Sequence, residues 1–431
     1  MTQPRTQTQS LPLVPDGPNL RRTASEMANA LPVIHAVGAY RPFQAQQPCS
    51  KLGIIVLLHL RPTLVAMAKA WISLGADPRD MLIVAKNYNY PEGDVVRIAL
   101  RDLGVTVVSV NDIGPALPIF LSELGDKLFM VVEDGGHIMP HVHKHPRLVG
   151  AIEQTTKGVR RCRAAIAKSR KPHLSLPESK FKQRFEPDHV ARAAVESIER
   201  LVAGHAYLAE MSVAVIGAAG TIGARIAEAL APKVREIVTF DCGEPRDFRL
   251  RAFAKFNVAG SAREAIAGRD LIVGSTGECT LRGPDIGELK DGAILASTGS
   301  ERTEFPVALL ELLSERAEPF RPSPANTITG PAHGTIYTLR PRGKGIILLN
   351  DGEPVNFSHL APPEAAVFDL IMGAILVGSI ELALGRYANH AGFLDVFDAI
   401  VERHQLDEAF LALHGHLERY EPGEIEFSNR L

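Results

Sequence analysis

The chain has 431 residues, 45% of them hydrophobic and 22% charged, and its 47 basic and 49 acidic side chains leave a net charge of −2. This composition excludes wholesale disorder and is sufficient for two or three domains with large cores. The near-neutral charge provides no global attraction to nucleic acid or to an acidic membrane, so we expect small-molecule partners. Four cysteines without CxxC spacing indicate reduced thiols and a cytoplasmic protein.

Two segments near the ends of the chain bear on targeting. Residues 1–25 are rich in Thr, Gln and Pro, lack the order of an export signal and are expected to form a mobile tail. The apolar segment 371–384 is interrupted by Glu381 and is shorter than the roughly 20 residues that span a bilayer. It therefore predicts a buried helix rather than a membrane anchor.

The first part of the chain alternates apolar runs with amphipathic stretches. Strands are expected at 53–59, 81–86, 106–110 and 127–134, and helices at 63–74, 93–103 and 115–124. Continuous apolar runs are typical of parallel strands covered by helices on both faces. A basic stretch with three prolines, 168–188, is interpreted as a connector before a helical run at 189–209.

A second alternating series begins after residue 211. Strands are expected at 212–217, 236–241, 270–276 and 292–298, with helices at 221–230, 262–267 and 285–289. Hairpins are expected from 335 to 357, and helical runs at 371–386 and 394–413 close the chain. The whole pattern predicts an α/β fold with two Rossmann-like parallel sheets.

A glycine-rich turn between a strand and a helix is the strongest single motif. Gly217, Gly220 and Gly223 permit a tight turn, and the free N–H groups at the helix start point toward a pyrophosphate. The next strand ends in Asp241, whose carboxylate is placed to accept the ribose hydroxyls of NAD. The alternative is a glycine-rich turn that holds no ligand.

Other residues extend this predicted NAD site. Small residues end two further strands, where a dinucleotide lies along the carboxyl edge of a sheet. The predicted cofactor-binding residues outside the glycine triad are Thr221, Ile222, Asp241, Thr276, Gly277, Thr298 and Gly299. Arg246 and Arg249 follow Asp241 and keep NADP open as an alternative.

A second group of polar residues follows a strand of the first unit. The segment 132–137, VEDGGH, places carboxylates and an imidazole where parallel sheets place their sites, although an Asp before Gly-Gly also forms turns. The polar run 153–158, EQTTKG, comes next, and its hydroxyls are suited either to cap a helix or to contact a ligand.

These motifs together resemble S-adenosylhomocysteine hydrolases. EDGGHI, AIEQTTKGVRR, SKF, the glycine turn, IVGSTGE, LKDGAILASTGS and GIILLNDGEPVN occur in the order and spacing of that family, over residues 53–384. The resemblance implies a substrate domain, 26–188 and 352–431, that is interrupted by an NAD domain, 189–351. It also implies a homo-oligomer, either a dimer or a tetramer.

The resemblance further implies a reaction. In the family, tightly held NAD oxidises the 3′-hydroxyl of the nucleoside, a base removes the acidified neighbouring proton, the thiol leaves, water adds and the hydride returns, so the cofactor is not consumed. The positions that match the family are His59, Asn87, Asp134, Glu153, Thr155, Thr156, Lys180, Gly220, Gly223, Thr276, Gly277 and Asn356. We assign Thr155, Thr156 and Asn356 to the cofactor, and Asn87 and Glu153 to the substrate.

The chain departs from the family in the expected cleft. The family motif KSKFDN reads ESKFKQ at 178–183, so Glu178 replaces the catalytic lysine and Lys182 replaces an aspartate. These two side chains share a face if the segment is helical, and the alternative is an exposed ion pair. Gln154 replaces a ribose-binding carboxylate, and Arg61 replaces a threonine.

Other departures lie at Ser300, at 361–364 and in the C-terminal tail, where the basic aromatic ending of the family is replaced by EIEFSNRL. Arg61 and Lys182 add positive charge, which suggests a carboxylate or phosphate on the substrate. The losses also predict inefficient hydrolysis of S-adenosylhomocysteine itself.

Histidines cluster in HIMPHVHKHP, at positions 137, 141, 143 and 145. Alternating imidazoles suit zinc, but two prolines and the lack of a cysteine favour a surface loop, and we predict no metal. His137 follows Asp134 closely and is expected to act as a general acid or base. The predicted catalytic residues are therefore His59, Asp134, His137, Glu178 and Lys182, and the substrate-binding residues are Arg61, Asn87, Glu153 and Gln154.

Three functions are compatible with these residues. The first is an NAD-dependent enzyme that oxidises a nucleoside-like or small anionic substrate transiently. The second is a dehydrogenase or reductase with net redox turnover, and the third is a non-catalytic, NAD-binding regulatory homologue. Retention of His59, Asn87 and Asp134 favours an enzyme.

Overall fold

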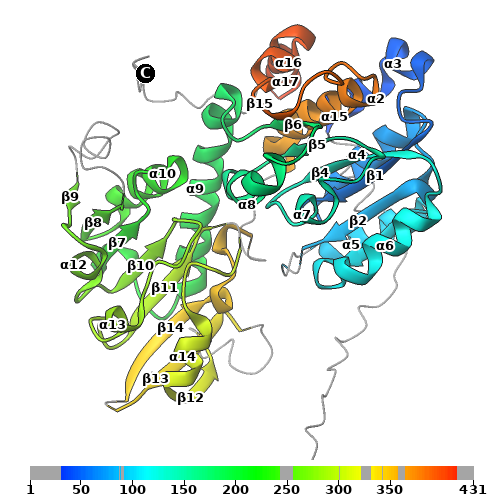
Figure 1. The fold of residues 1–431 in the computed structure, drawn as a ribbon. Coiled ribbons are helices and arrows are strands. Elements are labelled where there is room, and N and C mark those ends of the chain that lie inside the picture. The colour runs from blue at the N-terminus through cyan, green and yellow to red at the C-terminus, as the bar shows by residue number, and fades with distance from the viewer. Residues whose placement is uncertain are drawn as a thin grey trace, which may run out of the picture.

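The computed structural model describes residues 31–86, 88, 92–242, 256–299, 301–321, 332–341, 343–357 and 365–414. The predicted tail at 1–25, Asn87, Arg246, Arg249, Ser300 and the segment 361–364 lie outside these residues. Two sheets organise the described chain, and we call them sheet A and sheet B (Figure 1).

Sheet A has seven parallel strands in the order β15-β6-β5-β4-β1-β2-β3. Its strands are β1 (Leu52–Leu57), β2 (Met81–Ala85), β3 (Thr106–Ser109), β4 (Leu128–Glu133), β5 (Leu148–Glu153), β6 (Pro172–Ser175) and β15 (Gly392–Leu394). The helices around it are α2 (Pro32–Ala39), α3 (Arg41–Gln46), α4 (Pro62–Ser73), α5 (Gly93–Asp102), α6 (Ile113–Glu123), α7 (Met139–Val142), α8 (Thr156–Ile166), α15 (Asp369–Ala383), α16 (Phe397–His404) and α17 (Leu406–Leu413).

Both faces of sheet A are buried, as the continuous apolar runs predicted. Ile54 and Val56 of β1 pack into a core with α2, α4 and α15, whereas Ile55 and Leu57 pack into a second core with α6, α7 and α8. Successive side chains of a strand point to opposite faces, so burying all of them requires helices on both sides.

Sheet B has eight strands in the order β12-β13-β14-β11-β10-β7-β8-β9, parallel except at β12 and β13. Its strands are β7 (Ser212–Ile216), β8 (Glu236–Phe240), β9 (Asn257–Val258), β10 (Leu271–Gly274), β11 (Ala293–Ser297), β12 (Ser314–Pro319), β13 (Gly334–Leu339) and β14 (Lys344–Leu349). Its helices are α10 (Thr221–Leu230), α12 (Ala262–Ile266), α13 (Gly283–Ile286) and α14 (Val307–Leu313). The antiparallel β13–β14 pair confirms the first predicted hairpin, whereas the second is wrong, because 350–357 forms two short 3-10 helices.

The strand orders locate the places where ligands bind such folds. In sheet A, successive strands along the chain are added on one side of β1 up to β3 and on its other side from β4 onward. In sheet B, the same change of side occurs between β7 and β10. Loops that leave the carboxyl ends of two such strands diverge and open a crevice, which is where open α/β sheets bind ligands. The chain passes from one sheet to the other through the long helix α9 (Lys180–Val202), which runs between them (Figure 1).

The apolar segment near the end of the chain is a core helix, as predicted. Among the described residues, Ala366–Ala383 is long and apolar enough to cross a membrane, but 83% of it is buried inside the protein. In α15, Ser379 Oγ accepts a hydrogen bond of 2.8 Å from the indole of Trp71. Asp369 accepts two backbone N–H bonds from the first turn of α2, of 2.8 and 3.0 Å, so both ends of the described chain meet here.

Other features of local structure also differ from the expectations. The stretch 168–188 is not a connector, because it contains β6 and the first turns of α9, which continues through Pro187. The sequence analysis also missed β5 and α8. The predicted helical run 394–413 is two helices, α16 and α17, because Gln405 between them takes a left-handed conformation with φ of 51°.

Candidate functional site

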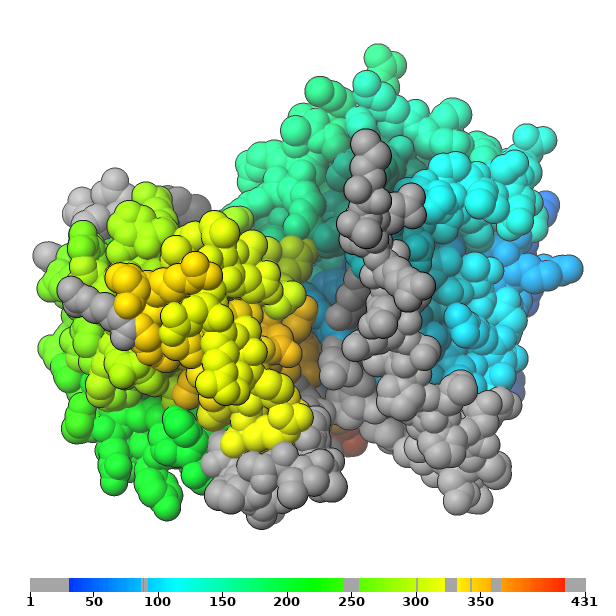
Figure 2. All heavy atoms as spheres, turned by 90° about the horizontal axis from the view of Figure 1, so that it is seen from below, coloured from blue at the N-terminus to red at the C-terminus, as the bar shows by residue number. Residues whose placement is uncertain are grey.

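A cavity of about 590 Å³ lies between the two sheets and is lined by residues of both. Figure 2 views the two halves from below, with the segments of sheet A in blue to cyan beside those of sheet B in green to yellow. Most residues predicted from sequence line this cavity: His59, Arg61, Asp134, Gln154, Thr155, Thr156, Glu178, Lys182, Gly220, Thr221, Ile222, Thr276, Gly277, Thr298, Gly299 and Asn356. Residues from distant parts of the chain therefore share one cavity.

On the sheet A side, a histidine and an aspartate form the polar centre. His59 follows β1 and Asp134 follows β4, the two strands at the point where sheet A reverses. His59 Nε2 lies 3.0 Å from Asp134 Oδ2. Burial first, and then the nearby positive charge of Lys86, lower the pKa of His59 to about 4, so its imidazole is neutral at physiological pH.

Aromatic rings hold the His59 imidazole. Its centroid lies 4.4 Å from that of Phe357 and 5.5 Å from that of Tyr88. Phe357 belongs to the segment that follows the last strand of sheet B, so residues that precede and follow the sheet B strands contact the imidazole. Rings at these separations pack favourably and restrict the orientation of the imidazole.

Lys86 is a residue of this centre that the sequence analysis missed. It directly follows β2, and its Nζ lies 2.6 Å from Asp134 Oδ1. Burial alone raises the pKa of Asp134, but the charge of Lys86 and the hydrogen bonds from His59 and Lys86 outweigh it and hold that pKa well below its usual range. Its place at the carboxyl end of an apolar strand could have indicated Lys86, but the sequence analysis named only the next residue, Asn87, as a site residue.

On the sheet B side, the glycine turn has the backbone that a dinucleotide site requires. Gly217 adopts φ of +87°, and a Cβ there would lie 2.6 Å from the carbonyl of Ser275. A Cβ on Gly223 would lie 2.2 Å from the Gly217 oxygen, so close helix–strand packing requires glycine. Gly220 is the N-cap residue of α10, and Gly220 and Thr221 line the cavity. The turn therefore fits the pyrophosphate of NAD at a helix start.

Asp241 lies where an NAD ribose is expected, at the end of β8. Its Oδ2 accepts a hydrogen bond of 2.9 Å from the backbone N–H of Ala219, so the carboxylate also fixes the glycine turn. Asp241, Gly217 and Gly223 do not belong to the residues that line the cavity. In the described structure, the two glycines allow the close backbone packing of the turn, and Asp241 holds the turn through the Ala219 N–H.

A buried glutamate that the sequence analysis missed fixes the other cofactor loop. Glu304 is fully buried, and its carboxylate accepts hydrogen bonds of 2.8 Å from Thr276 Oγ1, 2.7 Å from Thr280 Oγ1 and 2.5 Å from the Gly277 backbone. A Cβ on Gly299 would lie 2.7 Å from Glu304 Oε1. Both small-residue loops of the predicted NAD site therefore close around one side chain.

Two buried amides at the cavity have acceptor oxygens that no partner satisfies within the described part of the chain. They are Gln154 Oε1 and Asn356 Oδ1, on side chains that are 4% and 2% exposed. Buried acceptors without a donor are costly, so this pattern is typical of a site that receives hydroxyl or amide donors from a ligand. The feature fits NAD and a polyhydroxylated substrate.

The added cations of the cleft are paired with carboxylates. Arg61 Nε lies 2.8 Å from Glu92 Oε1, and Lys182 Nζ lies 2.9 Å from Glu186 Oε2. Lys182 also donates a bond of 2.8 Å to the backbone oxygen of Gln154. The predicted pairing of Lys182 with Glu178 was wrong, because α9 begins at Lys180 and leaves Glu178 exposed in the preceding turn.

Glu153 does not reach the cavity, contrary to the expectation that it binds substrate. It is fully buried beside Glu133, and its Oε1 accepts bonds of 3.0 Å from Gly135 N, 2.8 Å from Thr155 N and 2.7 Å from Thr155 Oγ1. Burial, and then the charges of Glu133 and Asp134, raise its pKa to about 8. Glu153 therefore supports the turn that follows β4 from beneath.

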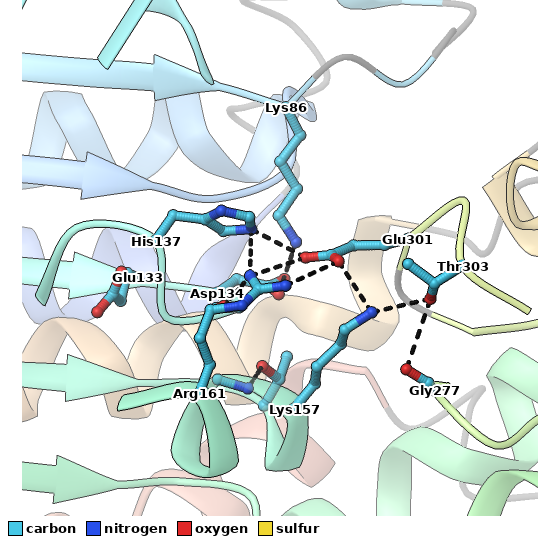
Figure 3. A network of polar contacts seen from close by, with 12 residues as sticks. Lys86, Glu133, Asp134, His137, Lys157, Arg161, Gly277, Glu301 and Thr303 are labelled. Atoms are coloured by element: carbon cyan, nitrogen blue, oxygen red, sulfur yellow. Dashed lines mark hydrogen bonds and ion pairs between the residues drawn. The ribbon is translucent and has the colours of Figure 1, made fainter. Parts of the chain in front are cut away.

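His137 contacts a carboxylate other than that of Asp134. Its Nε2 lies 2.9 Å from Glu301, which follows β11 of sheet B (Figure 3). Lys157 and Arg161 of α8 approach the same carboxylate at 2.8 and 3.0 Å. His137 therefore contacts the sheet B half and is not among the residues that line the cavity.

The histidine cluster does not converge in the described structure. His145 packs against Phe129 with ring centroids 5.1 Å apart, and His143 contacts the backbone oxygen of Pro140. The described side chains close enough to hold a metal together are Glu133, Glu153 and Cys162, all buried. Glu133 accepts a hydrogen bond from the backbone N–H of Ile138, and Glu153 accepts one from that of Gly135.

Two mostly parallel sheets, one of which carries a glycine-rich strand–helix turn, line a shared polar cavity and define an α/β protein with two Rossmann-like sheets. Comparison with curated proteins then gives relatives. The chain is 27% identical to adenosylhomocysteinase from Thermotoga maritima over 331 residues, covering 73% of this chain and 76% of that protein. It is therefore a divergent relative of the adenosylhomocysteinases, in agreement with its motifs.

Further relatives have other names. S-inosyl-L-homocysteine hydrolase from Methanopyrus kandleri is 25% identical over 75% of this chain and 74% of that protein. An uncharacterized protein of Mycobacterium tuberculosis is 24% identical over 84% of this chain and 71% of that protein. No family model matches the chain.

Solved structures give weaker similarity. A dipicolinate synthase chain from Bacillus halodurans aligns at 10% identity with a TM-score of 0.43, over 77% of this chain and 99% of that one. The NAD complex of formate dehydrogenase from Staphylococcus aureus aligns at 16% identity with a TM-score of 0.36, over 54% of this chain and 78% of that one.

Proposed function

We propose that this protein is an NAD-dependent enzyme that transiently oxidises a ribose hydroxyl of a nucleoside-like substrate. The observation that carries the proposal is the shared cavity: the loops of Gly220, Thr276 and Thr298 line it from sheet B, and His59 and Asp134 line it from sheet A. The sheet B loops would hold NAD, which would supply a hydride acceptor to the cavity that His59 and Asp134 also line.

The residues of sheet A suit proton transfer. The neutral imidazole of His59 is a base in reach of a ligand in the cavity, and Asp134 orients it through Nε2. An ionised carboxylate only accepts hydrogen bonds, so Nε2 carries the proton and Nδ1 is the basic nitrogen of the ring. Gln154 Oε1 and Asn356 Oδ1 are acceptors for substrate hydroxyls or for the amide of the cofactor.

A small anionic substrate now has less support than a nucleoside. Arg61 and Lys182 each have a carboxylate partner within 3 Å, so neither adds uncompensated charge to the cavity. Gln154 stands where the resemblance expects a ribose-binding carboxylate, and a neutral amide accepts hydroxyl hydrogens more weakly. Inefficient hydrolysis of S-adenosylhomocysteine therefore remains part of the proposal.

The experiment begins with the purified protein as it folds in the cell. Denaturation and chromatography of the released small molecules will detect co-purified NAD. Adenosine, S-adenosyl-L-homocysteine and S-inosyl-L-homocysteine are then added separately while the absorbance band of reduced nicotinamide is followed. We expect at least one to reduce the bound cofactor, and an Asp134→Asn variant with the same NAD content to respond at least tenfold more slowly.

The same experiment separates the alternatives. Free reduced cofactor that accumulates with turnover would instead favour a net dehydrogenase. Bound NAD that no nucleoside reduces would contradict the proposal and favour the non-catalytic regulatory homologue.

A further inference from the structure

Lys86 occupies a position for which neither the proposed chemistry nor the family motifs account. It follows β2, the strand next to β1 in sheet A, and its side chain is only 5% exposed. Its Nζ lies 2.6 Å from Asp134 Oδ1 (Figure 3), while the other carboxylate oxygen, Oδ2, lies 3.0 Å from His59 Nε2. Lysine, aspartate and histidine thus form a chain in that order, and its histidine end lines the cavity.

The carboxylate at the centre requires both neighbours. Asp134 is 1% exposed, and its backbone N–H is held by the Leu57 oxygen at the end of β1. A buried carboxylate is costly unless it is paired, and a neutral imidazole alone provides a single hydrogen bond and no charge. Lys86 supplies the positive charge that this anion needs.

We propose that Lys86 is the positioning residue of the His59–Asp134 pair. Its ammonium fixes the Asp134 carboxylate as an anion, so that the carboxylate accepts the Nε2 proton of His59 and the ring presents Nδ1 as its basic nitrogen. Lys86 is not among the residues that line the cavity, and it acts on the pair through its contact with Asp134 and through its charge near His59. The inference deepens the proposed function, since it specifies how the acid–base pair is kept in its working form.

Within the described residues, the charges that act on His59 come from Lys86, Asp134 and Arg61. Lys86 and Tyr88 follow β2, Asp134 follows β4, and Arg61 lies two residues along the loop of His59 itself. Arg61 is paired with Glu92, whereas Lys86 contacts Asp134 directly. Removing the Lys86 charge therefore leaves Asp134 as the dominant charge beside the imidazole.

The test measures proton uptake by the pair and needs no substrate. Histidine labelled with ¹³C at Cε1 and aspartate labelled at Cγ are followed by NMR through a pH titration of the full-length protein. His59→Asn and Asp134→Asn assign the two signals. In Lys86→Met, we expect the midpoint of proton uptake by the pair to rise by at least one pH unit, a tenfold change in proton affinity.

A conservative variant separates charge from structure. Lys86→Arg keeps a cation at this position, so we expect its midpoint to return toward that of the wild type, whereas a purely structural role would make both variants alike. Cooperative thermal unfolding of each variant shows that it is folded. If Lys86→Met is too unstable to titrate, Lys86→Gln with the same labels replaces it.

An unchanged midpoint in the folded Lys86→Met or Lys86→Gln protein would overturn the inference. Failure of the proposed function is distinguishable, because the NMR titration depends on neither NAD nor a nucleoside. Where a nucleoside does reduce the bound cofactor, the acid limb of that reaction should move to higher pH in Lys86→Met and back in Lys86→Arg.

Discussion

Glu301 receives a bidentate contact from Arg161, with Nη1 at 3.0 Å from Oε1 and Nη2 at 3.0 Å from Oε2. Arg161 lies on α8 beside sheet A, and Glu301 follows β11 of sheet B, so this fork joins the two walls of the cavity (Figure 3). Lys157 adds a second cross-connection, 2.9 Å from Thr303 Oγ1. The contacts at Glu301 therefore connect the sheet A half to the sheet B half.

Removing the Glu301 carboxylate should weaken the contact between the sheet A half and the sheet B half. In Glu301→Gln, we expect a larger radius of gyration by small-angle X-ray scattering in cofactor-free protein, because the amide cannot pair with Lys157 and Arg161. Rising salt should expand the wild type and leave the variant unchanged, since partly exposed ion pairs are screened. Glu288→Gln is the control, because Glu288 pairs with Arg263 within the sheet B half alone. Equal behaviour of the two variants would show that Glu301 does not hold the halves.

The glycine turn predicts a substitution that weakens NAD without harming the fold. Gly220 is the N-cap of α10 with φ of −69° and ψ of 152°, a position and conformation that Asp and Asn favour. Gly220→Asp places a negative charge where the pyrophosphate binds, so we expect at least tenfold weaker NAD binding, about 1.4 kcal/mol, with unchanged thermal stability.

Gly220→Asn is the matched control, because it has the same shape and capping ability without the charge. Isothermal titration with NAD compares the two variants. Equal affinities would show that the turn does not hold a phosphate.

The buried pair Glu133 and Glu153 predicts a dependence of stability on pH. Burial raises the pKa of Glu153 to about 8 in the folded protein, against a usual value of 4.5. The unfolded chain therefore loses this proton at lower pH than the folded chain does, and stability falls as pH rises from about 4.5 to about 8. Above pH 8 this contribution is constant.

Glu153→Gln removes that titration and keeps an acceptor oxygen for Gly135 and Thr155. We expect its melting temperature to fall less than that of the wild type between pH 5 and pH 8. The control is Glu178→Gln, since Glu178 is exposed and contacts no buried acid. Parallel curves for the wild type and Glu153→Gln would contradict the assignment.

Local patterns in the sequence predicted the sheets and the cofactor turn because these depend on short segments. Each strand of the two switch points is a continuous apolar run, and the glycines are required by backbone geometry within a few residues. Asp134 was recoverable for the same reason, because it lies directly after such a strand, whereas His59 was predicted from the resemblance to the family.

Contacts between distant segments were not predictable in the same way. Glu301 and Arg161 are 140 positions apart, and nothing near either residue indicates the other. The beginning of α9 was misjudged because prolines at 172, 177 and 187 suggested a loop, whereas Pro187 lies within the helix. Lys182 therefore forms an ion pair with Glu186, one helical turn further along α9, and not with Glu178.

The central claim is that one cavity brings a nucleoside hydroxyl to NAD beside His59 and Asp134. Transfer of label tests it most directly: the protein with bound NAD is incubated with adenosine, and separately with inosine, deuterated at C3′. The dinucleotide is then released and its mass is measured. The account predicts that deuterium from at least one nucleoside appears on the nicotinamide in the wild type and at a much lower rate in Asp134→Asn. Bound NAD that acquires no deuterium from either nucleoside would contradict it.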